Sequence, residues 1–150
     1  MSRAPARRTW VLLTYKIPRE PTTPRVSVWR KLKRMGAVLL HDAVWVLPAT
    51  PQTRENLQWL ATEILEGGND AMLWEAQLPL PGQDAALVQQ FLAQVDREYD
   101  AMLAELAGDD PDLGLLARRY QQVQGQDHFH SERGHMVRTV LMDASRGMHR

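Results

Sequence analysis

The chain has 150 residues, of which 44% are hydrophobic and 24% charged, as expected for a single globular domain of ordinary size. It contains no cysteine, which excludes disulfides, cysteine-ligated zinc, iron–sulfur clusters and thiol nucleophiles. No apolar run approaches the roughly 20 residues of a membrane span, and no secretory signal pattern opens the chain. We therefore expect a cytoplasmic protein that makes no membrane contact.

The formal net charge is zero, but the charges are unevenly distributed along the chain. Residues 1–34 hold ten basic residues and one acidic residue, whereas residues 35–112 hold two basic and fourteen acidic ones. Most of the cations are arginines, whose planar guanidinium binds phosphate and other oxyanions. The alternative is an ordinary solvated surface. The acidic middle predicts either solvated helix faces or a surface that meets the basic helix of a second copy.

The first elements are set by β-formers, prolines and glycines. Residues 1–8 are predicted to be a mobile basic arm. Residues 9–17 (TWVLLTYKI) predict a buried strand, closed by Pro18. Threonines and prolines at 21–25 predict the start of a helix that ends at Gly36.

Two short strands are expected next, at residues 38–40 and 44–48, joined by a hairpin turn. Thr50 and the following proline predict the start of a second helix, which stops at Gly67. A fourth strand is expected at residues 71–78. The order β-α-β-β-α-β predicts an α+β fold, a ferredoxin-like sandwich over residues 9–80.

Residues 81–150 are predicted to be a helical extension of one domain that spans 1–150. An apolar stripe runs over residues 87–106, and a second helix is expected with Asp110 as N-cap. A last helix is expected at 132–142. Because this segment looks too small to bury a core of its own, we expect it to pack as part of the same domain.

Much of the positive charge falls within the first predicted helix. At about 100° per residue, its apolar half holds Val26, Val28, Trp29, Leu32 and Met35. Trp29 is therefore predicted to lie in the core rather than to serve as a stacking platform. The residues expected to bind nucleic acid or an oxyanion are Lys16, Arg19, Arg25, Arg30, Lys31, Lys33 and Arg34. Arg7 and Arg8 of the arm add to this surface.

Three histidines, His128, His130 and His135, form the weak candidates for a metal site. A polar loop that caps a helix is the favoured interpretation, and we predict no resident metal or cofactor. No glycine-rich phosphate loop, nucleophile elbow or dinucleotide fingerprint is present, so we expect no enzymatic activity.

Two groups of residues carry a family resemblance. The first group comprises Trp10-Val11-Leu12-Leu13, Arg25, Val28-Trp29-Arg30, Leu32-Lys33, Gly36-Ala37 and Val44-Trp45-Val46-Leu47-Pro48. The second comprises Arg119-Tyr120, Asp127, Phe129-His130-Ser131, Gly134 and Val137-Arg138. Over residues 9–141 the chain resembles the N-terminal domain of ChrB, a bacterial family of chromate-resistance regulators, and more distantly the PaaX-type repressors.

The resemblance implies a DNA-binding regulator of a chromate-efflux operon, with chromate as a candidate effector and a homodimer as a candidate assembly. The alternative is an oxyanion-sensing or protein-interaction module that does not touch DNA. The family's longer members carry a further domain, so this chain is either a stand-alone version or the first domain of a longer protein. The related adaptation nucleases place an aspartate at the end of the first strand, where this chain has Thr14-Tyr15-Lys16, which argues against metal-dependent nuclease activity.

Overall fold

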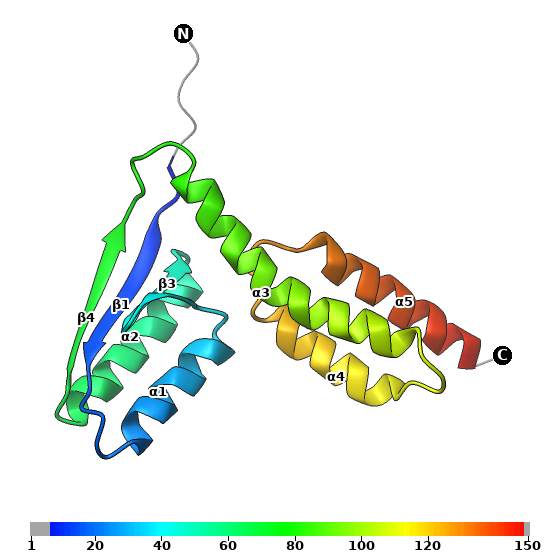
Figure 1. The fold of residues 1–150 in the computed structure, drawn as a ribbon, viewed down its shortest axis with the longest axis horizontal. Helices are drawn as coiled ribbons and strands as arrows, with labels where there is room; N and C mark the ends of the chain where they lie inside the picture. Colours follow the sequence, from blue (N-terminus) through cyan, green and yellow to red (C-terminus); the bar gives the residue numbers. More distant parts are fainter. Residues whose placement is uncertain (1–6, 149–150) are drawn as a thin grey trace, which may run out of the picture. The chain divides into compact units, whose positions relative to one another are not determined.

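The computed structural model describes residues 7–148, which form two compact units, one up to Leu87 and the other from Val88 on (Figure 1). Most of the basic arm predicted at residues 1–8 lies outside the described residues. Within residues 7–148, no helix is both long enough and apolar enough to span a membrane.

The first unit contains the four-stranded sheet and two helices. Its elements are β1 (Trp10–Lys16), α1 (Thr23–Arg34), β2 (Val38–His41), β3 (Val44–Pro48), α2 (Pro51–Glu66) and β4 (Asp70–Ala76). The sheet has the order β2-β3-β1-β4, and each neighbouring pair is antiparallel. The predicted α+β fold with a ferredoxin-like strand order is confirmed.

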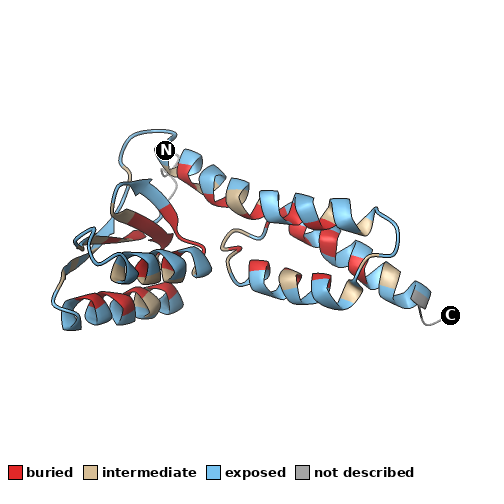
Figure 2. Ribbon diagram, turned by 60° about the horizontal axis from the view of Figure 1, so that its bottom comes forward, coloured by how far each residue is buried: buried red, intermediate tan, exposed pale blue. Residues whose placement is uncertain are grey.

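The register divides the side chains of the sheet between two faces, because directly paired residues point to the same side. Figure 2 shows α1 and α2 on one side of the sheet. Leu13 pairs with Trp45 and Leu73 on this side, where Glu75 of β4 forms an ion pair with Arg54 of α2. Leu12 pairs with Val46 and Trp74 on the opposite face. One part of the core of this unit therefore lies between the sheet and the two helices, and Trp10, Val38 and Val46 are buried on the opposite face.

The start of α2 was predicted correctly. Thr50 is the N-cap, its hydroxyl accepts a hydrogen bond from the backbone N–H of Thr53, and Pro51 occupies the first turn. The side chain of Thr53 is buried and donates to the carbonyl of Pro48 at 2.6 Å, so the cap also ties α2 to the end of β3. The helix ends at Gly67, as expected.

The second unit is helical. It contains most of α3 (Gln83–Leu106) together with α4 (Leu113–Gln124) and α5 (Glu132–Met148). These helices enclose their own apolar cluster, made by Val95, Tyr99, Met102, Leu116, Tyr120, Val123, Val137 and Leu141. The expectation that this segment is too small to bury a core of its own is therefore wrong.

The N-cap of α4 also differs from the prediction. Asp112, not Asp110, accepts a hydrogen bond from the backbone N–H of Leu115, at 3.1 Å. Asp110 has a positive φ of 49° and forms part of the preceding turn. Asp110 therefore belongs to the turn before Pro111, and Asp112, which follows this proline, begins the helix.

Candidate nucleic-acid interface

Helix α1 presents two different sides. Val28 and Leu32 are buried. The helix ends at Arg34 with Met35 as its C-cap, and the following Gly36 adopts a positive φ of 77° that suits glycine. Pro24 stands in the first turn. The sequence thus forms a short amphipathic helix with one anchored side and one exposed side.

Four cations of α1 are exposed, and we call them the basic face: Arg25, Arg30, Lys33 and Arg34. None of the four forms an ion pair with any residue that the structure describes. Positive charge without a carboxylate partner is what a polyanion such as nucleic acid requires.

Lys31 differs from the basic face. It is partly buried, and its ammonium group forms an ion pair with Glu63 of α2. Lys31 is thus the one predicted site residue of α1 whose charge is neutralised by a carboxylate among the described residues. Since Glu63 belongs to α2, Lys31 lies on the side of α1 that faces α2.

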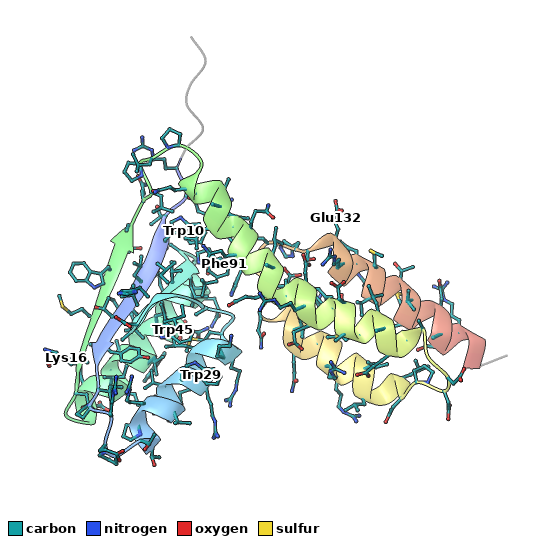
Figure 3. The ribbon with its side chains drawn as sticks, in the orientation of Figure 1. Trp10, Lys16, Trp29, Trp45, Phe91 and Glu132 are labelled. Atoms are coloured by element: carbon teal, nitrogen blue, oxygen red, sulfur yellow. The ribbon has the colours of Figure 1, made fainter. Side chains whose placement is uncertain are left out.

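Trp29 is 49% exposed, so the prediction that it lies in the core was wrong. The buried side of α1 is centred on Val28 and Leu32, which leaves both Trp29 and Val26 facing outward. The Lys33 ammonium lies 5.9 Å from the centre of the Trp29 ring, within cation–π range. Figure 3 shows Trp29 projecting from α1.

Trp29 is a candidate functional residue that the sequence interpretation missed. Its spacing gives no single signal, because Trp29 lies four residues from the exposed Arg25 and Lys33 but three residues from the buried Leu32. Residues three and four apart share a helix face, so the sequence fits a buried indole as well as an exposed one.

A shallow hollow of about 460 Å³ lies along α1. It is lined by Val26, by three residues that carry hydroxyl groups (Thr22, Thr23 and Ser27) and by the cations Arg30, Lys31 and Arg34. The structure thus gathers three of the predicted site residues around hydroxyl donors. Hydroxyl and guanidinium donors in one hollow suit a phosphate or another oxyanion.

The other predicted site residues lie elsewhere. Lys16 is exposed at the end of β1, where it pairs in register with Asp70 and lines a different hollow with Met72 (Figure 3). Arg19 is exposed in the segment between β1 and α1 and lines neither hollow.

Arg8 lies away from the cations of α1. Its guanidinium forms an ion pair with Asp84 at 2.9 Å and lies 5.9 Å from the Trp10 ring centre. The Trp10 indole N–H donates to the same carboxylate at 2.8 Å. Arg8 is therefore engaged at the start of β1 rather than on α1.

The three histidines do not form a metal site. His130 and His135 are exposed, whereas His128 is partly buried and packs edge-on against Phe91, with ring centres 6.1 Å apart. Within residues 7–148, no group of three His, Asp or Glu side chains is arranged to hold a metal ion.

The residues around the histidines instead hold the helical unit together. Asp127 is buried, and its carboxylate accepts hydrogen bonds from the backbone N–H of Ser131 and from the hydroxyl of Tyr99, each at 3.0 Å. The Ser131 hydroxyl donates to Asp96 and accepts from the backbone N–H of Arg133. Burial, followed by the hydrogen bond to Asp127, raises the pKa of Tyr99 above its ordinary value. This network begins α5 and fastens it to α3.

The comparisons with known proteins agree with the resemblance found in the sequence. The family model described as "Protein ChrB, N-terminal" matches residues 25–107, more than half of the chain. The chain is also 31% identical to "Protein ChrB" of Cupriavidus metallidurans over 121 residues, which cover 74% of this chain and 36% of that protein. The chain thus spans about a third of the length of this relative. It belongs to the family of the N-terminal region of ChrB.

Proposed function

We propose that this chain acts in chromate resistance by binding DNA through the basic face of α1 and controlling transcription of chromate-efflux genes. The observation that carries the proposal is the set of four exposed cations on one short helix with no carboxylate partner among the described residues. Binding to phosphates releases condensed counterions from DNA and therefore drives association. Membership of the ChrB N-terminal family supports the chromate-resistance part of the proposal.

The dimensions of α1 suit a DNA groove. Its 12 residues span about 18 Å, and the major groove of B-DNA is wide enough, at about 12 Å, to accept one helix. In this proposal the basic face contacts phosphates, and Trp29 supplies an apolar contact to a base methyl group or to sugar. The role is binding rather than catalysis, and the site of action is the cytoplasm.

The test is a salt series of binding to the promoter of a chromate-efflux operon, measured by fluorescence anisotropy. We expect the double variant Arg30→Ala with Arg34→Ala to bind more weakly. The slope of log affinity against log salt concentration should become shallower by up to about 1.8, because each lost phosphate contact removes about 0.9.

The matched control is Arg118→Ala with Arg138→Ala, which removes the same charge from exposed positions of α4 and α5. This control should keep most of the wild-type slope. Equal losses in the two double variants would show that only net charge matters, and an unchanged slope in the first would exclude α1 as the contact.

A second candidate function is oxyanion binding without DNA, and the hollow lined by Ser27, Arg30 and Arg34 favours it. A ligand stabilises the state that binds it, so chromate should raise the melting temperature of the wild-type chain. The Arg30→Ala, Arg34→Ala variant should lose this shift. Sulfate at the same concentration separates selective binding from a general ionic effect.

A further inference from the structure

The two edges of the sheet differ in how well they are protected from pairing. Strand β4 forms one edge (Figure 1) and pairs with β1 over seven consecutive residues with no register shift. Strand β2 forms the other edge, has only four residues, and contains a shift between Leu39 and His41. Short strands and bulges are devices that prevent edge pairing, and only β2 has them.

Strand β4 also lacks the other common forms of edge protection. Its sequence, DAMLWEA, contains neither proline nor lysine. Its acidic residues are Asp70 and Glu75, and the latter is paired with Arg54 of α2 at 2.6 Å. Long, regular edge strands with exposed apolar side chains are expected to pair with another strand.

Two large apolar side chains stand exposed beside this edge. Met72 is 56% exposed and Trp74 is 47% exposed, and both lie on the sheet face opposite α1 and α2. The indole N–H of Trp74 donates to the hydroxyl of Thr14 on β1, at 2.9 Å. The exposed ring is thus held in place before any partner arrives.

We propose that two copies of this chain associate by antiparallel pairing of their β4 strands, centred on Leu73, to form one eight-stranded sheet. Leu73 is the middle residue of β4, so this is the only register in which all seven residues pair. Moving the centre by one residue leaves five pairs. The proposal goes beyond DNA binding and does not depend on it.

The side chains of β4 are complementary in this register. Met72 lies opposite the partner's Trp74, and Trp74 opposite the partner's Met72, which gives two contacts between thioether and indole on the open face. Asp70 lies opposite the partner's Ala76, and Glu75 opposite the partner's Ala71. The four carboxylates are therefore kept apart, whereas a centre on Met72 would put Asp70 opposite the partner's Trp74. Charge and apolar contacts both favour a second copy as the occupant of this edge.

The first test is the oligomeric state of the full chain in solution, measured by sedimentation equilibrium in the absence of DNA. Wild type should show a monomer–dimer equilibrium, and Met72→Lys should weaken it at least tenfold, because it removes both contacts between thioether and indole and puts a lysine on the edge strand, where lysine opposes pairing. The control is Met136→Lys on α5, which is 54% exposed and should dimerise like wild type.

The second test is disulfide cross-linking through a single introduced cysteine. Because the chain contains no cysteine of its own, any cross-link forms at the introduced position. Directly opposite Cα atoms in an antiparallel pair lie about 4.5–5.5 Å apart, within the range that a disulfide spans. Leu73→Cys should therefore form a covalent dimer under mild oxidation. Asp70→Cys should not, because the two copies of position 70 would lie about 20 Å apart at 3.3 Å per residue.

A wild-type chain that stays monomeric at high micromolar concentration would overturn the proposal, as would equal cross-linking at positions 70 and 73. A dimer that Met72→Lys leaves intact would show that another surface is used. Because DNA is absent from both tests, a failure here is distinct from a failure of the DNA-binding proposal.

Discussion

Gly134 leaves the space that the ring of Tyr99 occupies. A Cβ atom at position 134 would lie 2.9 Å from Cζ of Tyr99 and 3.0 Å from its hydroxyl oxygen. The tyrosine is 1% exposed, and its hydroxyl is held by Asp127, so the ring has little room to move. Packing of α5 against Tyr99 of α3 therefore explains why position 134, one of the positions that carry the resemblance to ChrB, holds a glycine.

This contact predicts that Gly134→Ala destabilises the chain, although alanine is the better helix former by about 1 kcal/mol. Overpacking in a fixed core costs about 1–3 kcal/mol, and contact with three atoms of a held ring at 2.9–3.0 Å favours the upper part of that range, which exceeds the gain. The matched control is Gly114→Ala in α4, where the nearest atom to a Cβ is 3.6 Å away. We expect this control to be neutral or stabilising. Urea denaturation measures both variants, and equal effects would contradict the packing argument.

The environment of Tyr99 predicts a loss of stability at high pH. Burial and the hydrogen bond to Asp127 raise the pKa of Tyr99 in the folded chain, whereas in the unfolded chain it stays near 10. Below about pH 10 the phenol is neutral in both states, and its contribution to stability is complete. Above that pH the unfolded chain loses this proton first, so the free energy of unfolding falls as the pH rises.

Tyr99→Phe isolates this effect. At pH 8 the variant should be less stable by about 1–2 kcal/mol, since Asp127 loses a buried hydrogen-bond donor. Above pH 10 its stability should fall less steeply than that of wild type, and the two curves should converge. Denaturation curves between pH 8 and pH 11 measure the difference, and parallel curves would contradict the assignment.

The ion pair between Lys31 and Glu63 predicts an unusual gain in binding. Glu63→Gln removes the carboxylate that neutralises Lys31, so DNA affinity should rise and the salt slope should steepen by up to about 0.9. The pair is partly exposed, and the free energy of unfolding should change by no more than about 1 kcal/mol. Glu66→Gln, which removes the same charge from an exposed position of α2, is the control and should give a smaller change.

Trp29 should contribute to binding without adding to the salt dependence. Trp29→Ala is expected to weaken DNA binding by about 1 kcal/mol or more, because an apolar contact to a nucleotide is lost while the number of neutralised phosphates stays the same. Trp59→Ala is the control, since Trp59 on α2 is 69% exposed and lies outside the basic face. Equal binding by the two variants would exclude Trp29 from the interface.

The order of the elements could be predicted from the sequence because prolines, glycines and caps mark their ends. Pro18, Gly36 and Gly67 each close a segment whose periodicity is clear, and Thr50 with Pro51 identifies the start of α2. These signals are local, and the structure confirms the βαββαβ order that they predict.

The face that α1 buries could not be predicted in the same way. Its apolar residues Val26, Val28 and Trp29 fit more than one orientation of a 12-residue helix. The orientation is revealed by Lys31, whose partner Glu63 lies 32 residues further along the chain. A contact at that distance leaves no periodic signal in the helix itself. For the same reason the pattern did not show that Trp29 stays outside the core.

The division between the two units falls after Leu87, within the continuous helix α3. Proteases cleave chain that is locally unfolded, so an intact helix offers them no site at this division. Limited digestion should instead cut the non-helical segments at 77–82 and 107–112. A fragment that ends at Leu87 would keep only the first five residues of α3 and would lack the rest of that helix. Fragments designed to fold as separate units therefore cannot both contain the whole of α3.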